Sequence, residues 1–560
     1  METQQPTTPS NSRSKLVIGV VAGLLIVALV AAGIIFIPRL LSPASAVNPT
    51  AAAMPAGTQI YFSFNPHYEN LPNGGVVKKA WDEDVLAKLF EDSFLQALEQ
   101  ANLNWEQDIA SWLGDEVGFG IADLSFDQFS SSEPPTFVVA AATRDKAKSD
   151  AFLAKLRAEA ESNGKEFTEQ SYRDAATVEE AGGVGEVALA YATVKDTVIV
   201  ASGSSALHTA IDAVLDGSGL DKSGNFQAAV GKLRGGRAMT AYIDAGPILK
   251  MLVEQVQQSG EMSGAFDQQV LDTLTAMQGE ALGLSFEPNG MLLELVATVD
   301  LDQMPAESLA ALTAPGAANT LLRAVPDTTF TYFGGEVRPE TFEAVFAAPT
   351  MQETLDAIEM QTGINLQEDV LSWLNGEIAL TVLPGTLSGG SSLPVGFAFL
   401  VKPEDKELAT TRLDALMQKI AEQAFAEVVD VTVGDSSLRA LMDDSGEPMV
   451  VYGLIGESLV IAVPENAAQK IANAGDRPLA DAETFKTAVA PLPASNSGYL
   501  YIQPKPILDL VTLALAFSGE ECPACDLLQP VRGIAFAAEQ PQTETGVGRG
   551  VLFILLDVEE

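Results

Sequence analysis

A long-period internal repeat constrains the fold of this chain more than any other feature of its sequence. Residues 104–116 read NWEQDIASWLGDE and residues 365–377 read NLQEDVLSWLNGE, so 6 of 13 positions are identical at an offset of 261. The segment from Tyr242 to Leu249 recurs from Tyr501 to Leu508 at an offset of 259, with 5 of 8 positions identical. Weaker matches fall in the same order. A spacing of about 250 residues is the size of a domain, so the sequence predicts one folding unit that occurs twice.

The predicted units cover residues 54–300 and 321–560, and residues 301–320 are predicted to link them. Within each unit, short runs of alternating apolar residues predict strands, and apolar residues spaced three and four apart predict helices. Several predicted strands are neighbours that turn back directly, as at Lys195-Asp196. Adjacent hairpins favour antiparallel pairing. The predicted class is therefore α+β, with a largely antiparallel sheet in each of two tandem homologous units.

An apolar run of 22 residues, LVIGVVAGLLIVALVAAGIIFI, extends from Leu16 to Ile37. At a rise of 1.5 Å per residue, a helix of this length spans about 33 Å, which exceeds a hydrocarbon core of about 30 Å. The apolar part of a cleavable signal peptide has only about 7 to 15 residues. We therefore expect a transmembrane helix over residues 16–37. Ala44-Ser45-Ala46 resembles a cleavage site, so a form processed after Ala46 is an alternative.

Basic residues on either side of the apolar run predict its orientation. Arg13 and Lys15 precede the run, and Arg39 alone follows it closely. By the positive-inside rule, residues 1–15 form a cytoplasmic tail, residues 38–53 form a juxtamembrane linker, and both units lie outside the cytoplasm. The sequence therefore predicts a single-pass protein of the cell membrane with extracytoplasmic C-terminal domains.

The composition excludes several classes of function. The 32 Lys and Arg residues face 75 Asp and Glu residues, which gives a net charge of −43, although 47% of the chain is apolar. Because phosphate binding needs concentrated basic side chains, we expect no nucleic-acid partner. With 2 histidines and 2 cysteines, the chain cannot form a His/Cys metal cluster or a disulfide scaffold, and we expect no cofactor. The few cysteines and the lack of any Asn-x-Ser/Thr acceptor favour a bacterial envelope.

Three phrases carry a resemblance to a known family. The second repeat opens with LLRAVPDTTFTYF at residues 321–333, and the Ser-Trp-Leu and Tyr-Ile-x-x-x-Pro-Ile-Leu phrases follow later in each case. Together with a single N-terminal apolar span, they resemble the DUF3352 family of bacterial proteins of unknown function. The resemblance covers nearly the whole extracytoplasmic part. It implies the location and the fold, and it brings no catalytic residues to transfer.

The sharpest local motif is Cys522-Pro523-Ala524-Cys525, because a CxxC pair can form a redox-active dithiol or half of a zinc site. No other cysteine completes a zinc site. The motif follows a polar run between two apolar helical stretches, whereas a thioredoxin-like site begins a helix after a buried strand. We therefore expect a small structural disulfide or unpaired thiols at Cys522 and Cys525, with a redox function as the alternative.

Other conspicuous side chains are predicted to be structural. Trp112 and Trp373 occupy matching places in the repeat, each three residues after an aliphatic residue, and are predicted to anchor the core. His67 and His208 lack a neighbouring nucleophile motif, so exposed or capping histidines are expected. Four carboxylates recur at helix or strand starts, where capping is favoured over acid/base catalysis. These carboxylates are Asp108, Asp369, Glu116 and Glu377.

Three classes of function are compatible with these observations. The first is a non-catalytic envelope protein that binds or scaffolds other components, and it is favoured because no nucleophile elbow, phosphate loop or basic patch is present. The second is a carrier of an apolar or lipid-like ligand between sheet and helices. The third is an enzyme of unrecognised type. An apolar cavity would favour the second class, and convergent buried titratable groups would favour the third.

Overall fold

The computed structural model of the chain describes residues 48–81, 103–124, 135–181, 188–259, 268–305, 309, 316–337, 355–357, 359–360, 363–385, 395–442, 446–518, 522–542 and 545–558. The predicted cytoplasmic tail, the predicted transmembrane helix over residues 16–37 and the predicted linker up to residue 47 lie outside this part of the chain. Within the described ranges, no helix is both long enough and apolar enough to cross a membrane.

The fold is α+β with a large antiparallel sheet, as the sequence predicts. All strand pairings with a defined register among the described residues are antiparallel. The chain forms two compact units. Unit 1 runs to Met251 and includes Gly279–Pro288, and unit 2 comprises Leu252–Gln278 and Asn289–Glu560.

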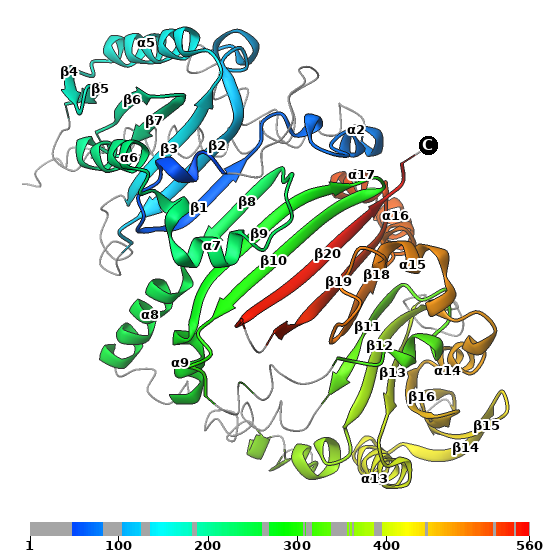
Figure 1. Cartoon of the computed structure of the whole chain (residues 1–560). Coiled ribbons are helices and arrows are strands. Elements are labelled where there is room, and N and C mark those ends of the chain that lie inside the picture. The colour runs from blue at the N-terminus through cyan, green and yellow to red at the C-terminus, as the bar shows by residue number, and fades with distance from the viewer. Residues whose placement is uncertain are drawn as a thin grey trace, which may run out of the picture. The chain divides into compact units, whose positions relative to one another are not determined.

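Nine strands of unit 1 form its sheet, in the spatial order β4-β5-β6-β7-β3-β2-β1-β8-β9. Their bounds are β1 (Thr58–Phe64), β2 (Leu113–Ala122), β3 (Thr136–Thr143), β4 (Phe167–Tyr172), β5 (Ala175–Glu180), β6 (Ala190–Val194), β7 (Thr197–Ala201), β8 (Met239–Ile243) and β9 (Met277–Glu287). Figure 1 shows β1, β2 and β3 as neighbours within this sheet.

Unit 2 contains the strand order β14-β15-β16-β17-β13-β12-β11-β18-β19-β20-β10. These strands are β10 (Gly290–Val299), β11 (Thr331–Val337), β12 (Gly376–Pro384), β13 (Val395–Lys402), β14 (Glu427–Val433), β15 (Ser436–Met442), β16 (Pro448–Ile455), β17 (Ser458–Val463), β18 (Gly498–Ile502), β19 (Val531–Gln542) and β20 (Val547–Leu556). Raising each strand number of unit 1 by ten gives the first nine strands of this order. Strand β10, which the sequence assigned to the first unit, pairs with β20 in unit 2.

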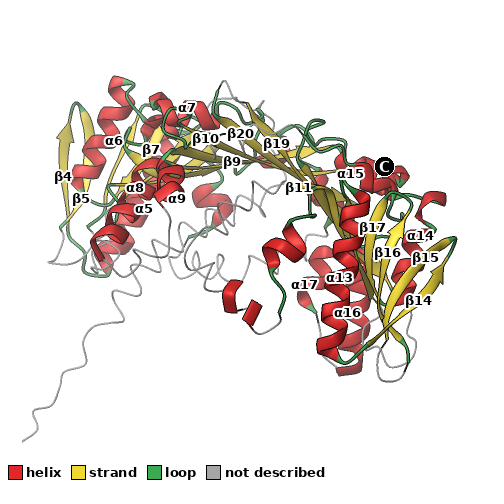
Figure 2. Ribbon diagram, turned by 90° about the horizontal axis from the view of Figure 1, so that it is seen from below, coloured by secondary structure: helices red, strands yellow, loops and turns green. Residues whose placement is uncertain are grey.

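Helices cover both faces of the sheet in unit 2. Helix α14 contributes Ala467, Ala468 and Ile471 to one apolar core, and α13 contributes Leu413 and Met417 to another. Figure 2 shows these two helices on opposite sides of β16 and β17. The helices with bounds in this unit are α9 (Gln268–Thr275), α13 (Lys406–Ala424), α14 (Glu465–Ala472), α15 (Glu483–Val489), α16 (Pro504–Ser518) and α17 (Pro523–Leu528).

Unit 1 places comparable helices on its own sheet. Leu153 of α5 packs into the core around Trp112, and Phe226 of α7 packs against Tyr61 with ring centroids 5.7 Å apart. The helices are α2 (Val76–Ala80), α5 (Lys146–Ser162), α6 (Ser204–Asp216) and α7 (Gly224–Val230), and α8 (Ala245–Ser259) continues from this unit into the next.

A pair of tyrosines faces across two neighbouring strands in each sheet. Tyr61 of β1 is the register partner of Tyr242 of β8, and Tyr332 of β11 is the register partner of Tyr501 of β18. All four side chains are buried. Aromatic rings facing one another across neighbouring strands stabilise the pairing and its register. The Tyr-Phe and Tyr-Ile phrases of the sequence therefore mark the pair β1 and β8 in unit 1 and the pair β11 and β18 in unit 2.

Candidate functional site

A buried glutamate caps the start of a 3₁₀ turn in each unit. The Glu116 carboxylate accepts the backbone N–H of Thr50 at 2.9 Å and the Tyr61 hydroxyl at 3.3 Å. Thr50 is the N-cap of a 3₁₀ turn at Ala51–Ala53. A carboxylate that accepts N–H groups at a helix start satisfies donors that would otherwise be buried without partners. Glu116 therefore has a structural role.

Glu377 makes the matching contacts in unit 2. Its carboxylate accepts the backbone N–H of Leu321 at 2.9 Å and the Thr320 hydroxyl at 2.5 Å, at the start of a 3₁₀ turn over Thr320–Arg323. Glu116 and Glu377 are each 8% exposed. Glu116 therefore links the first 3₁₀ turn of unit 1 to strand β2, and Glu377 links the corresponding turn of unit 2 to strand β12.

The repeated aspartates hold a second set of matching contacts. Asp108 accepts the backbone N–H of Asn104 at 2.7 Å and the Lys155 ammonium at 2.7 Å. In unit 2, the Asp369 carboxylate accepts hydrogen bonds from the backbone N–H of Asn365 at 2.9 Å and from the Lys419 ammonium at 2.6 Å. In both aspartates, the hydrogen bond from lysine lowers the carboxyl pKa. These contacts fix a single π-helical turn.

The two tryptophans of the repeat lie in equivalent apolar cores. Trp112 and Trp373 are each 3% exposed. Their indole N–H groups donate to the carbonyls of Asp108 and Asp369, both at 2.7 Å. Phe152 of α5 packs against Trp112 with ring centroids 5.3 Å apart. A buried indole whose single donor is satisfied suits a packing role rather than ligand stacking.

The histidines differ from the expectation of exposed or capping side chains. His67 is the N-cap residue of the 3₁₀ turn Tyr68–Asn70, but its side chain makes no cap hydrogen bond; it is only 2% exposed, and its Nε2 atom lies 3.2 Å from the Leu113 carbonyl oxygen. Burial lowers the His67 pKa. His208 of α6 is half-buried and stacks on Tyr172 at a centroid distance of 3.9 Å, with Glu179 at 3.6 Å from its Nε2 atom.

Cys522 and Cys525 are joined by a disulfide at the start of helix α17. Cys522 is the N-cap residue, and Cys525 is 5% exposed. The bond closes a loop of four residues and joins no distant elements. The described residues contain no cluster of three or more His, Cys, Asp or Glu side chains that could hold a metal ion.

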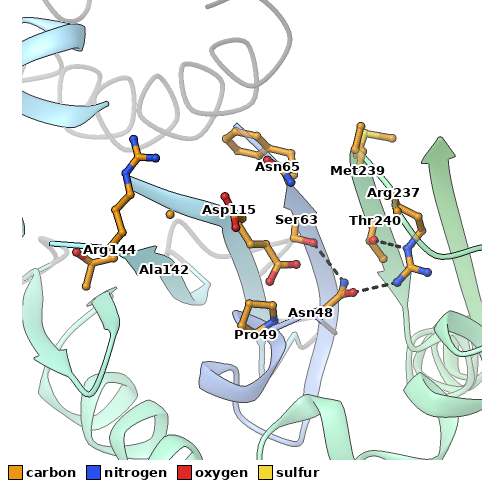
Figure 3. Close-up of a pocket in the computed structure, with 16 residues that line it drawn as sticks. Asn48, Pro49, Ser63, Asn65, Asp115, Ala142, Arg144, Arg237, Met239 and Thr240 are labelled. Carbon is orange, nitrogen blue, oxygen red and sulfur yellow. Dashed lines mark hydrogen bonds between the residues drawn. The ribbon is translucent and has the colours of Figure 1, made fainter. Parts of the chain in front are cut away.

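A polar cavity lies in unit 1 beside Glu116. Its volume is about 260 Å³, and it opens where the ends of β1, β2, β3 and β8 meet. Figure 3 shows the Asn48 side chain between Ser63 and Arg237. The lining comprises Asn48, Pro49, Ser63, Phe64, Asn65, Gly114, Asp115, Glu116, Ala142, Thr143, Arg144, Gly236, Arg237, Ala238, Met239 and Thr240.

Hydrogen bonds connect one wall of this cavity. The Arg237 guanidinium donates from Nε to the Thr240 hydroxyl at 3.1 Å and from Nη2 to the Asn48 amide oxygen at 2.9 Å. The Asn48 amide nitrogen donates to the Ser63 hydroxyl at 3.5 Å. Ser63 and Thr240 face each other as register partners of β1 and β8. These groups are therefore held in place before any ligand arrives.

Burial also raises the pKa values of two acidic groups beside the cavity, Glu116 and Tyr61. It raises the pKa of the Glu116 carboxyl, although hydrogen bonds from Thr50 and Ser63 act in the opposite direction. Burial and the Glu116 charge raise the Tyr61 pKa. Desolvation disfavours the charged form of each acid. Protonation of Glu116 is therefore easier than for an exposed glutamate.

Different residues occupy the corresponding strand positions in unit 2. The register partners of β11 and β18 at this point are Gly334 and Tyr499, where unit 1 has Ser63 and Thr240. Asn496, which aligns with Arg237, is 1% exposed and accepts from Asn319 at 3.1 Å, whereas in unit 1 Arg237 donates to Asn48. A tyrosine ring and a satisfied buried amide thus stand where unit 1 has a threonine and an arginine.

Comparisons with known proteins identify the family. The profile of DUF3352, described as a protein of unknown function, matches residues 17–556. The chain belongs to the DUF3352 family. No curated protein matches this DUF3352 chain.

Two solved structures of TP0453 show a distant likeness to the DUF3352 chain. Crystal form III is 12% identical with a TM-score of 0.25, and the match covers 47% of this chain and 84% of that one. Crystal form IV is 14% identical with a TM-score of 0.24, and the match covers 47% and 83%.

Sequence reasoning missed the cavity of this DUF3352 protein. Its residues come from five separate segments, at 48–49, 63–65, 114–116, 142–144 and 236–240, and no motif joins them. One signal was present in the sequence. Aligning the two repeats places Tyr499 and Asn496 opposite Thr240 and Arg237, which are changes in size and charge within an otherwise similar segment.

Proposed function

We propose that this protein is a membrane-anchored extracytoplasmic binding protein without catalytic activity, and that the cavity of unit 1 binds a small polar ligand. The observation that supports this proposal most directly is the difference between the units. Capping contacts are similar around Glu116 and Glu377, whereas at the neighbouring strand ends unit 1 has Ser63 and Thr240 beside a polar cavity and unit 2 has Gly334 and Tyr499. Such a local divergence within a common scaffold is expected of a binding site.

The proposal includes a duplication. Residues 54–300 and 321–560 are two copies of one ancestral unit, and the shared strand order, the paired tyrosines and the capping glutamates support this origin. The copies keep the residues that hold the scaffold. The cavity is where the first copy acquired its binding function.

The predicted topology places the cavity outside the cytoplasm. Residues 16–37 form the anchor, and Arg13 and Lys15 keep the N-terminus inside. An alkaline phosphatase fusion at Glu560 should be active, since that reporter requires export. Moving the two basic residues to positions after the apolar run is the matched control and should reduce the activity. An inactive fusion at Glu560 with the natural flanks contradicts this placement.

The nature of the lining distinguishes binding from the alternatives. Carriage of a lipid-like ligand needs an apolar cavity, but hydroxyl, amide, carboxylate and guanidinium groups line this one. Nucleophilic catalysis needs a base beside a nucleophile. The Ser63 hydroxyl instead accepts from Asn48, and no histidine or cysteine is among the lining residues.

Closing the cavity tests the proposed function. Thr240→Tyr introduces the side chain that unit 2 carries at Tyr499, and Tyr499→Phe in unit 2 is the matched control. The full chain is purified in detergent, and native mass spectrometry measures the small molecules that it retains. We expect wild type and Tyr499→Phe to retain a small molecule that Thr240→Tyr lacks. Identical spectra for all three proteins contradict the proposal.

A further inference from the structure

The sheet of unit 2 ends at strand β14, which pairs with β15 alone among the described residues. A two-residue turn at 434–435 joins the two strands, and Val433 immediately precedes it. In such a hairpin the residues that flank the turn form a hydrogen-bonded pair, and every second pair before them does the same. The backbone N–H and C=O groups of Val428, Asp430 and Thr432 therefore point away from β15. Figure 1 shows the β14–β15 hairpin at the end of this sheet.

Exposed side chains along β14 show that this edge is uncovered. The Asp430 side chain is 88% exposed, and Glu427 and Thr432 are exposed as well. Natural proteins protect such an edge with lysine, proline or a bulge, because its unpaired backbone groups can pair with another chain. Strand β14 reads EVVDVTV, without lysine or proline, and its register with β15 runs without a shift. Strand β14 is therefore open to an added strand.

The corresponding edge of unit 1 has a different character. Strand β4 reads FTEQSY and has four consecutive exposed polar residues. Arg157 of α5 donates to Glu169 of this strand and lies over the Phe167 ring at 5.9 Å from its centroid. Strand β14 instead contains four valines, and β-branched side chains favour strand pairing. The two copies have thus diverged at the outer edge of the sheet.

A strained and exposed phenylalanine lies next to β14. Phe425 follows the last residue of α13 in the left-handed conformation, with a φ of 54°, and it is 94% exposed. The aligned residue of unit 1, at the offset of 261, is Gly164 with a φ of 87°. Glycine adopts this conformation freely, whereas the Cβ atom of phenylalanine opposes it. Strain kept at an exposed apolar ring points to an interaction rather than to packing.

The charges beside the edge indicate which kind of strand can pair there. Residues 422–435 contain four acidic residues and no basic residue. The Asp430 carboxylate lies 3.8 Å from Arg439 of β15, but this arginine also holds Asp414. A second copy of β14 would bring the same acidic charges to the edge, and like charges destabilise strand pairing. Basic side chains on the added strand would stabilise it.

We propose that β14 accepts, as an added strand, an extended segment of another protein that is basic and rich in β-branched residues. Its β-branched side chains lie beside Val429 and Val431, which pack against the core under α14. Its basic side chains lie beside Asp430 on the opposite face, and an apolar side chain packs on Phe425. In strand addition, main-chain hydrogen bonds give affinity and side chains give specificity. This surface belongs to unit 2, so the inference does not depend on a ligand in the unit 1 cavity.

The test uses the full chain in detergent and a fluorescein-labelled peptide of alternating lysine and valine, KVKVKVK, whose binding is measured by fluorescence anisotropy. Two control peptides carry N-methyl groups, one on every lysine amide and the other on every valine amide. Each edge of a strand presents the N–H groups of alternate residues. One methylated peptide should therefore bind at least about tenfold more weakly than the unmodified peptide, and the other should bind equally well.

The three peptides have the same charge, so they separate strand addition from simple attraction to an acidic protein. Equal binding of all three would show attraction by charge alone and would overturn the inference. Absence of binding by the unmodified peptide would overturn it as well.

Three variants assign the binding to β14. Thr432→Pro removes a backbone N–H that points away from β15, so the ladder with β15 keeps its hydrogen bonds while the ring blocks an added strand. This variant should bind the peptide at least about tenfold more weakly. Ser171→Pro makes the same change at the aligned, outward-facing position of β4 and should leave binding unchanged. An equal loss of affinity in both proline variants contradicts the assignment to β14.

Phe425→Gly gives unit 2 the residue that unit 1 carries at this position. It should raise the Tm, because the backbone strain is relieved, and it should weaken peptide binding. A structural role for the ring predicts a lower Tm instead. Unchanged binding in both Phe425→Gly and Thr432→Pro would overturn the inference, since the first variant keeps its fold.

Light scattering separates the proposed partner from a second copy of this chain. The wild type and Thr432→Pro should have the same oligomeric mass. A wild-type dimer that dissociates in Thr432→Pro would show that β14 pairs with itself, and it would overturn the proposal of a basic partner. The retained molecule in the Thr240→Tyr comparison decides the proposed function whatever the result for β14.

Discussion

Unit 1 and unit 2 share similar capping and packing contacts but differ at the neighbouring strand ends. A glutamate caps the entry turn in each, an aspartate–lysine pair fixes the π-helical turn, and a tryptophan fills the core beside it. At the neighbouring end of the sheet, Ser63 and Thr240 stand opposite each other in unit 1, and Gly334 faces Tyr499 in unit 2. The scaffold therefore tolerates large changes at the strand ends while its capping residues stay the same.

The comparison teaches which carboxylates to regard as structural. Glu116 lines the cavity, and alone its burial and raised pKa would suggest a catalytic acid. Glu377 has a comparable capping role in unit 2, where its carboxylate accepts a backbone N–H and a threonine hydroxyl. Because a glutamate caps the entry turn in each unit, capping is sufficient to explain Glu116. Asp115 has no such counterpart, because unit 2 has Gly376 at that position.

The largest expected effect tests whether the tryptophans are equivalent. Trp112→Ala and Trp373→Ala should each lower the free energy of unfolding by about 3–5 kcal/mol, because each leaves a large cavity and unpairs a buried carbonyl. Urea unfolding followed by circular dichroism measures both. Met360→Ala, at a side chain 82% exposed, is the control and should change little. If only one of the two variants lowers the free energy of unfolding by less than about 1 kcal/mol, the two tryptophans are not equivalent.

The disulfide is a feature that unit 1 lacks, since the chain contains no other cysteine. Replacing Cys522 and Cys525 with serine should lower stability by at most about 2 kcal/mol, because a four-residue loop restricts the unfolded chain little. Treating the wild type with dithiothreitol should give the same shift in Tm. If the double variant keeps its Tm but loses the retained ligand, a redox role replaces the structural one.

The buried glutamate predicts a pH effect in unit 1. Because the Glu116 pKa is raised in the folded state, the folded chain binds more protons than the unfolded chain above the ordinary glutamate range. The contribution of Glu116 to the free energy of unfolding therefore falls as pH rises through that range, by at most about 1.4 kcal/mol per pH unit. Glu116→Gln should remove this part of the slope of unfolding free energy between pH 4 and 7.

Glu377→Gln is the matched control for that slope. It leaves Glu116 in place, so the difference between wild type and Glu116→Gln should persist in its background. If Glu116→Gln and wild type have parallel pH profiles, Glu116 titrates as an ordinary exposed glutamate and its described burial is incorrect.

The smallest expected effects concern the two aspartate–lysine pairs. Lys155→Met and Lys419→Met should each cost at most about 1 kcal/mol at pH 7, because both lysines are partly exposed. The lysines lower the pKa of Asp108 and Asp369, so this stability is present above the unfolded pKa of aspartate and is lost as pH falls through the lowered value. Losses that differ between the pairs by more than about 1 kcal/mol would distinguish the two π-helical turns.

Regular elements were predictable from the sequence where burial imposes a pattern. The strands at Thr58–Phe64, Thr136–Thr143 and Thr197–Ala201 are rich in apolar residues and bury several of them, which is the kind of pattern that predicts a strand. The hairpin of β4 and β5 was missed, since its first strand has four exposed polar residues and no apolar alternation. Apolar periodicity identifies only strands that bury a face.

The candidate site was less predictable than the strands. Capping by Glu116 and Glu377 was inferred from position, but their partners Thr50 and Leu321 lie in segments that the sequence assigned to linkers or unit starts. The cavity depends on the register of β1 against β8, which places Ser63 beside Thr240 across 177 positions of sequence. The residues within one segment do not show which distant strand it pairs with, so nothing in the sequence indicated this pairing apart from the comparison of the two repeats.

Chemical labelling tests the central claim most directly, because it measures whether the cavity is open without requiring a ligand. Ser63→Cys places a thiol in the cavity wall, and a small methanethiosulfonate reagent carrying an ammonium group reports its accessibility in the full chain, whose own cysteines are joined. The account predicts that labelling is at least about tenfold faster in Ser63→Cys than in the Ser63→Cys/Thr240→Tyr double variant, which carries the tyrosine of unit 2. Equal rates in the two proteins would contradict it.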